Sequence, residues 1–144
     1  MRRIFILLCC LSLSALSNAE ECERTGKEDF SRFLTRFSID KAFAVSRTVY
    51  PLNVVLWHHG LDGTDVEPPT RSLLTKEKDE AAPSLGSYMS DNGLTSYVLA
   101  VESRAALVEV YRDGTNWVET LHFARNGRCW YLREFQDHSS SNFR

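Results

Sequence analysis

The chain has 144 residues, of which 43% are hydrophobic, and its formal net charge is −2 at pH 7. This length and composition predict one globular domain with a single core. An acidic chain without a basic stripe is a poor partner for nucleic acid or for an anionic membrane surface, so we expect neither.

Residues 1–19 have the pattern of a secretory signal peptide. Two arginines precede an apolar stretch from Ile4 to Leu16, and Ser-Asn-Ala ends the segment with the small residues that a cleavage site requires. The apolar stretch is too short to span a bilayer comfortably, which disfavours a membrane anchor. We therefore expect cleavage before Glu20, a single domain over residues 20–144, a periplasmic or secreted location in bacteria, and no membrane association after cleavage.

Two cysteines, Cys22 and Cys129, remain after that cleavage. An even pair in an exported, oxidising setting predicts a disulfide that ties the mature N-terminus to the last strand. Closing a loop of about 108 residues would stabilise the fold by up to about 4–5 kcal/mol in the chain-entropy model. Two free thiols are the alternative. A zinc site is disfavoured because the cysteines lack paired spacing.

The clearest helix is predicted over Lys27–Phe37. Its apolar residues recur at the helical period and form one stripe: Phe30, Phe33, Leu34 and Phe37. Such a stripe is more typical of a core-facing helix than of a ligand-binding wall. A second helix over residues 39–47 is predicted to begin at a Ser38 cap, and Pro51 prevents any continuation.

The middle of the chain predicts a broken hairpin. Leu52–His59 has the composition of a strand, and a Gly-rich turn follows it. The return strand is expected to resume near Arg71–Thr75, at a sheet edge, because Pro68-Pro69 cannot donate ladder hydrogen bonds. Residues 76–92 predict a short helix and a loop.

Two turn signals, Asp113-Gly114 and Asn126-Gly127, lie between runs rich in β-branched, aromatic and other apolar residues. Asp-Gly and Asn-Gly favour tight hairpin turns because both central residues of such turns need φ > 0. Together with a weaker turn at Ser103-Arg104, they predict an antiparallel meander of four strands, at residues 95–102, 105–112, 115–125 and 128–136.

The order of these elements predicts an α+β fold, in which N-terminal helices pack on a curved antiparallel sheet that ends in the four-strand meander. A curved sheet with helices in its concave side forms a cone with a pocket. The element order resembles that of the nuclear-transport-factor-2-like (NTF2-like) fold, whose members share an architecture without sharing a function.

The start of the mature chain also resembles a family of small exported bacterial proteins of unknown function. The resemblance covers about twenty residues, with a Phe-rich helix, then Asp, Phe, and an Arg before Pro-Leu: Phe30, Phe33, Phe37, Asp40, Phe43, Arg47 and Pro51-Leu52. It implies export and a related fold, but no chemistry. The chain departs from the pattern at Ala44, where a polar residue is expected.

The two hairpin turns fix a strand register, and directly opposed residues share a face. The resulting core face packs on the phenylalanine stripe and contains Val108, Val110, Trp117, Leu121, Phe123, Trp130 and Leu132. The same register places Glu119 beside Glu134. Such a pair could share a proton and act as general acid and base, with His58 as a further candidate. A solvated rim position, neutralisation by Arg47 or Arg71, or a bulge that turns both glutamates outward are the alternatives.

The opposite face of the meander is amphipathic. Its candidate protein-binding residues are Leu107, Tyr111, Val118, Tyr131, Arg133 and Phe135. Exposed apolar patches that contain Tyr and Arg are typical of protein interfaces. The expected partner is another protein or a second copy of this chain. Coverage of the face by the N-terminal segment is the alternative.

One further cluster has metal-binding side chains: His58, His59, Asp62 and Asp65. Adjacent strand residues point to opposite faces, so we expect no metal site here. The sequence has no phosphate-binding loop or dinucleotide motif, and we expect no cofactor. Asp40 and Arg47 are seven residues apart, which is two helical turns, so their side chains could point the same way. An ion pair with a neighbouring element is favoured for them over the binding of a substrate between them.

Export, acidity and the apolar patch favour a non-enzymatic binding protein that docks another protein through its sheet face. An immunity or inhibitor protein that neutralises a toxin fits this description. Two alternatives stay open: an enzyme that uses Glu119, Glu134 or His58 in the pocket, and a small-ligand carrier that uses the pocket without chemistry.

Overall fold

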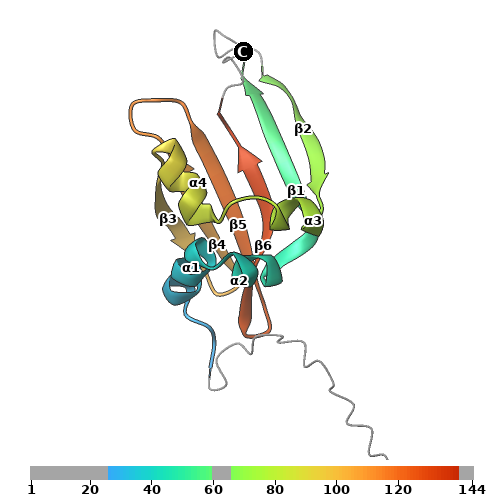
Figure 1. The fold of residues 1–144 in the computed structure, drawn as a ribbon, viewed down its shortest axis with the longest axis vertical. Helices are drawn as coiled ribbons and strands as arrows, with labels where there is room; N and C mark the ends of the chain where they lie inside the picture. The colour runs from blue at the N-terminus through green and yellow to red at the C-terminus, as the bar shows by residue number, and fades with distance from the viewer. Residues whose placement is uncertain (1–25, 60–65, 140–144) are drawn as a thin grey trace, which may run out of the picture.

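The computed structural model describes residues 26–59 and 66–139 and confirms the α+β, cone-like fold (Figure 1). These residues form four helices and six strands: α1 (Phe30–Ile39), α2 (Lys41–Ser46), β1 (Thr48–His59), β2 (Val66–Leu74), α3 (Lys76–Glu80), α4 (Leu85–Asn92), β3 (Thr95–Val101), β4 (Ala105–Tyr111), β5 (Val118–Asn126) and β6 (Cys129–Asp137). The helices lie against one face of the curved sheet.

The strands form one sheet in the order β2-β1-β6-β5-β4-β3. From β3 to β6, each strand pairs antiparallel with the next strand in the sequence, so the predicted meander is confirmed. β1 pairs antiparallel with β2 but parallel with β6, which makes the whole sheet mixed. A parallel pair needs a long connection, and the middle of the chain supplies it.

α1 begins at Phe30, three residues later than predicted, because the residues before it are held by other contacts. The backbone N–H of Glu28 donates to the carbonyl of Arg128 at 3.0 Å. Asp29 then caps the helix, since its side chain accepts from the backbone N–H of Arg32 at 2.9 Å.

The phenylalanine stripe of α1 is core, as predicted. Phe30, Phe33 and Phe37 are buried. Their rings lie 5.3–5.5 Å from the ring of Phe123, and Phe30 also meets Trp130 edge-on at 5.0 Å. Burial of several aromatic rings in such contacts is a large part of the stability of a domain this size.

α2 is shorter than predicted and begins at a different cap. The side chain of Asp40, not that of Ser38, accepts from the backbone N–H of Phe43 at 3.0 Å. The Ser38 hydroxyl instead donates to the carbonyl of Leu34, one turn back, at 2.9 Å. Asp40 is also the C-cap of α1, so this single residue separates the two helices.

The β4–β5 connection is longer than the two-residue turn predicted at Asp113-Gly114. Val110 lies opposite Glu119 and not opposite Trp117, a shift of two residues. Because side chains alternate with a period of two, this shift leaves each one on its predicted face. The predicted core face is therefore confirmed, with Trp117 partly buried and six buried members: Val108, Val110, Leu121, Phe123, Trp130 and Leu132.

A β-bulge interrupts the β5–β6 pairing. Phe123 lies opposite Leu132, but the next residue back, His122, lies opposite Glu134. Arg133 is the extra residue on β6, and beyond it the faces of β6 are exchanged relative to the predicted register.

This bulge makes two predictions wrong. Glu134 was predicted to lie beside Glu119, but it is turned to the face away from the helices. The residue opposite Glu119 is Asp137. Phe135 lies opposite Leu121 and packs against the core, so it does not belong to the outer face.

The middle of the chain is more regular than predicted. β2 contains Pro68-Pro69 and lies at the sheet edge, as predicted. The stretch predicted as a loop contains α4, which begins after Ser84, whose side chain accepts from the N–H of Ser87 at 3.2 Å. The helix ends at Gly93, whose φ of 61° favours glycine.

The predicted signal peptide, Cys22, Asp62 and Asp65 lie outside the described residues. Cys129 begins β6, and its disulfide with Cys22 stays a prediction. Within residues 26–59 and 66–139, no helix has both the length and the apolar character needed to cross a membrane.

Candidate functional site

The concave side of the sheet holds a cavity of about 260 Å³, which α2, α3 and α4 help to enclose. Its walls are mostly apolar and include Phe37, Leu52, Val54, Leu121, Leu132 and Phe135. The volume is close to the lower limit of small-molecule sites, about 300 Å³, and an apolar lining is typical of such sites.

One wall of the cavity comes from the segment that joins β2 to β3. α3 and α4 contain no buried residue. Nevertheless this segment contributes five of the lining residues: Asp79, Ala82, Pro83, Leu85 and Tyr88. Leu85, Tyr88 and Met89 of α4 nevertheless pack against the core, and Leu94, which follows α4, is buried in it. Helices that bury no residue completely belong to the part of a fold that opens most easily.

At one end, this cover is held by Asp79 of α3. The Tyr50 hydroxyl donates to the carboxylate of Asp79, and Lys41 Nζ lies 2.7 Å from Asp79 Oδ1. Burial and the Asp79 carboxylate raise the pKa of Tyr50, which keeps its hydroxyl a hydrogen-bond donor. The Asp79 carboxylate thus accepts hydrogen bonds from both Lys41 and Tyr50 beside the cavity.

At the other end, the cover is held by Glu119 of β5, whose residue surface is 3% exposed. Glu119 Oε1 accepts from the Tyr88 hydroxyl at 2.5 Å and from Trp117 Nε1 at 2.9 Å. No described residue hydrogen-bonds the buried Oε2 atom. Burial raises the pKa of Glu119 and the nearby Asp137 raises it further, although the bonds from Tyr88 and Trp117 oppose both.

Glu119 does not line the cavity, and strand register places it one residue pair beyond the lining residues on the same face of the sheet. Leu121 lies opposite Phe135, and both line the cavity. Glu119 lies opposite Asp137, in the next pair on the same face, which is about 7 Å further along the strands. Tyr88 links Glu119 to the cavity, because its side chain lines the cavity and its hydroxyl donates to Glu119.

The three residues predicted as alternative catalytic groups are not brought together. Glu119 faces the helices, whereas Glu134 lies on the other face and accepts from Gln136 Nε2 at 2.6 Å. His58 contacts Thr70 of the edge strand β2, with Nε2 and Oγ1 2.7 Å apart. None of the three lines the cavity, and Glu119 reaches it only through its hydrogen bond with Tyr88, which does line it.

All but one of the predicted protein-binding residues lie on the outer face of the sheet or at its bulge. Leu107, Tyr111, Val118 and Tyr131 are half-buried, and Arg133 is exposed at the bulge. Phe135 lines the cavity instead. The binding role of the other five stays a prediction.

A run of exposed apolar residues on the sheet was not singled out from the sequence. It lies on the edge strand β3 and contains Tyr97, Val98, Leu99 and Val101. β3 carries no charged residue and no proline, the usual devices that protect a sheet edge. That absence was the sequence signal that could have identified them.

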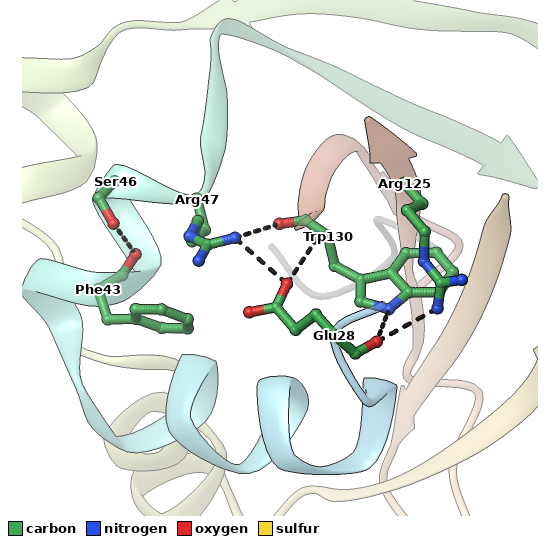
Figure 2. Close-up of polar contacts among 6 residues, drawn as sticks. All are labelled: Glu28, Phe43, Ser46, Arg47, Arg125 and Trp130. Carbon is green, nitrogen blue, oxygen red and sulfur yellow. Dashed lines mark hydrogen bonds and ion pairs between the residues drawn. The ribbon is translucent and has the colours of Figure 1, made fainter. Parts of the chain in front are cut away.

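A buried ion pair, whose partner Glu28 was not predicted from the sequence, closes the opposite end of the concave face. Arg47 is 3% exposed and Glu28 is 8% exposed, and their Nη1 and Oε2 atoms lie 3.2 Å apart (Figure 2). Glu28 Oε2 also accepts from the backbone N–H of Trp130 at 2.7 Å. The expected ion pair of Arg47 with a neighbouring element is confirmed.

The backbone of Glu28 extends this network. Its carbonyl accepts from Trp130 Nε1 at 3.1 Å and from Arg125 Nη2 at 3.2 Å (Figure 2). Arg47 also lies over the ring of Phe43, with 5.0 Å between the guanidinium carbon and the ring centre. These contacts tie the start of the described chain and α2 to the β5–β6 hairpin, and they point to a structural role.

In the described part of the chain, no group of three or more His, Cys, Asp or Glu side chains could hold a metal ion.

Comparison with known proteins identifies the fold but no family. No protein-family model and no curated protein matches the sequence. An NTF2-like protein from Bacteroides fragilis aligns in structure over 81% of this chain, with a TM-score of 0.58 and 22% identity. This chain spans half the length of that protein. A cystatin-like protein from Bacteroides caccae aligns over 78% of this chain and 77% of its own, with a TM-score of 0.52 and 22% identity.

The chain thus has an NTF2-like, cystatin-like fold. At 22% identity, neither likeness carries an activity, a ligand or a partner over to this chain.

Proposed function

We propose that this protein is a non-enzymatic binding protein whose concave cavity holds a small, mainly apolar ligand. The observation that carries the proposal is the cavity of about 260 Å³ with its apolar walls and its loosely packed cover. A helix cover that buries no residue of its own allows a ligand to enter without disruption of the core. The catalytic alternative loses its main support, because Glu119 and Glu134 lie on opposite faces.

Filling the cavity tests the proposal. Ala44 is buried in the cavity wall, whereas Ala42 is exposed on the same helix. Ala44→Leu should weaken binding of 2-methylnaphthalene at least tenfold because the added atoms occupy the ligand's space. Ala42→Leu should leave it unchanged. Fluorescence titration measures both affinities. Absence of saturable binding to the wild type, or equal effects of the two substitutions, would overturn the proposal.

Export is part of the same proposal. The pattern of residues 1–19 supports a signal peptide that is cleaved before Glu20, with the mature protein in the periplasm or outside the cell. A Cys22–Cys129 disulfide would then form in that oxidising compartment. N-terminal sequencing and non-reducing mass spectrometry of the protein from its native host test both points. An intact Met1 or two free thiols would contradict them.

A second candidate function is the docking of another protein on the sheet, as an immunity or inhibitor protein does. The exposed apolar residues of β3 favour it, and Tyr97 extends them to Tyr111 through an edge-to-face ring contact at 5.5 Å. Leu99→Lys should abolish capture of a stoichiometric partner that Ala44→Leu retains. Capture that persists with Leu99→Lys would contradict docking at this strand.

A further inference from the structure

The cavity wall carries one pair of charged side chains, Lys41 of α2 and Asp79 of α3. All other described residues that line the cavity are uncharged. The Lys41 side chain is 27% exposed and that of Asp79 is 18% exposed, so both charges are largely withdrawn from solvent. In apolar binding sites, a small number of polar groups fixes the orientation of the ligand. This pair is therefore where polar recognition is to be sought.

The ion pair leaves Lys41 with unused hydrogen-bonding capacity. A lysine ammonium group carries three N–H donors and no acceptor. Asp79 Oδ1, 2.7 Å from Nζ, takes one of these donors, and no other described residue accepts from Nζ. Because Nζ belongs to one lining residue and is hydrogen-bonded to another, the two remaining donors lie at the cavity wall.

The hydroxyl groups of the lining residues have already used their donors. The Thr48 hydroxyl donates to the carbonyl of Ala44 at 2.8 Å, and the Tyr88 hydroxyl donates to Glu119. Among the described side chains that line the cavity, Lys41 is thus the one that keeps a hydrogen-bond donor for a ligand. Each oxygen of Asp79 already accepts a hydrogen bond, from Lys41 or from Tyr50.

We propose that Lys41 Nζ is the hydrogen-bonding subsite of this cavity, and that the ligand is a neutral apolar molecule with one carbonyl oxygen. A carbonyl oxygen only accepts, so it matches a wall that offers a donor and needs no acceptor in return. An anionic ligand is disfavoured because the charge of Lys41 is already compensated by Asp79, and a second carboxylate would lie close to the first. The inference rests on the proposed binding function and adds the chemical class of the ligand.

The test compares two probes of nearly equal shape, 2-acetylnaphthalene and 2-isopropenylnaphthalene, in which a methylene group replaces the carbonyl oxygen. An apolar cavity alone would prefer the hydrocarbon, because burial of an unpaired carbonyl is unfavourable. With the Lys41 subsite, the ketone should bind about three- to tenfold more tightly, as expected for one hydrogen bond from a charged donor that is partly exposed. Fluorescence titration of the purified protein measures both affinities.

Variants assign this preference to the ammonium group. Lys41→Met keeps an unbranched side chain but removes the donors, and it should reverse the order of the two probes. Lys76→Met is the matched control, because Lys76 also forms an ion pair, with Glu80, but does not line the cavity. It should leave the ketone preference unchanged. If Lys41→Met does not fold, the wild type decides: an NMR cross-relaxation signal should join the acetyl methyl group to the Lys41 ε-methylene protons, and its absence would overturn the inference.

The outcomes separate this inference from the binding function. If neither probe binds, the cavity proposal fails and this inference fails with it. If the hydrocarbon binds as tightly as the ketone or more tightly, or if the ketone preference survives Lys41→Met, the cavity stands and the Lys41 subsite is wrong.

Two further probes test the neutral, acceptor-only class. Tighter binding of 2-naphthoate than of the ketone would mean that Lys41 selects an anion. Tighter binding of 2-naphthol would mean that the ligand donates a hydrogen bond to Asp79. Either result would overturn the proposed class, whereas weaker binding of both probes than of the ketone would support it.

Discussion

The two ends of the concave face are built differently. Under α1 the space is filled: Phe33 is 2% exposed, its ring lies 5.5 Å from that of Phe123, and Trp130 is completely buried. Under α3 and α4 the covering helices bury no residue, and a cavity remains above Leu121 and Phe135. One continuous sheet thus supports a close-packed core and a hollow side by side.

This difference separates stability from binding. Close packing and the buried ion pair at the α1 end hold the fold together, so substitutions there should change the free energy of unfolding. The α3–α4 end contributes less packing, so substitutions there should chiefly change ligand binding and local opening.

The largest contrast is expected between two apolar truncations. Phe33→Ala removes a buried ring from the packed end and should lower the free energy of unfolding by about 3–5 kcal/mol. Leu85→Ala removes a half-buried side chain from the cavity wall and should cost about 1 kcal/mol or less. Urea denaturation measures both. Similar losses of unfolding free energy for the two variants would show that the α1 end is not more closely packed than the α3–α4 end.

Removal of the buried cation should be nearly as costly. Arg47→Met leaves Glu28 with an uncompensated buried charge and should cost about 3–5 kcal/mol in urea denaturation. Lys76→Met is the matched control, because Lys76 and Glu80 form an ion pair in which both side chains are more than half exposed, at 3.6 Å. It should cost less than about 1 kcal/mol. Equal costs would show that the buried pair does not hold the hairpin.

A smaller effect is expected where the cover is held. Tyr50→Phe removes the hydroxyl that bonds Asp79 and should weaken that attachment by about 0.5–1.5 kcal/mol. Amide hydrogens of residues 76–80 should then exchange faster with solvent, while those of β5 should not change. Uniformly faster exchange would mean that Tyr50 stabilises the whole fold and not the cover.

The smallest effect concerns pH. The pKa of Glu119 is raised in the folded protein, so the folded state holds this proton at pH values where the unfolded state, with a pKa near 4.5, has lost it. Stability relative to Glu119→Gln should therefore be greatest below pH 4.5 and should fall as the pH rises through the folded-state pKa. Urea denaturation at several pH values measures the difference. A difference that grows with pH would contradict the raised pKa.

Periodic features were predictable from the sequence. The spacing of Phe30, Phe33 and Phe37 indicates a core-facing helix, and the turn signals near Gly114 and Gly127 indicate the meander. The core face was predicted correctly although the β4–β5 turn was not, because a two-residue shift conserves the faces.

Features that depend on a single inserted residue or on distant contacts were not predictable. The bulge at Arg133 has no turn residue to mark it, yet it moves Glu134 outward and Phe135 inward. Glu28 falls within the helix predicted over Lys27–Phe37 but not on its apolar stripe, and its partners Arg47 and Trp130 are far away in the sequence. The cavity depends on how loosely α3 and α4 pack, which composition does not encode.

The structure gives physical roles to the motif that resembles the exported family. Its phenylalanines on α1 form the core, Asp40 caps α2, and Arg47 binds Glu28. These roles are structural, so the motif marks a way of closing one end of the sheet.

The measurement that most directly tests a binding cavity at the α3–α4 end is a methyl NMR titration with 2-naphthol. A binding cavity at this end should give saturable shifts of the methyl signals of Ala44, Val54 and Leu121, residues that line the cavity, and should leave the signals of Leu107 and Val118 on the outer face unchanged. Shifts confined to Leu107 and Val118 would contradict it and would place the binding surface on the outer face of the sheet.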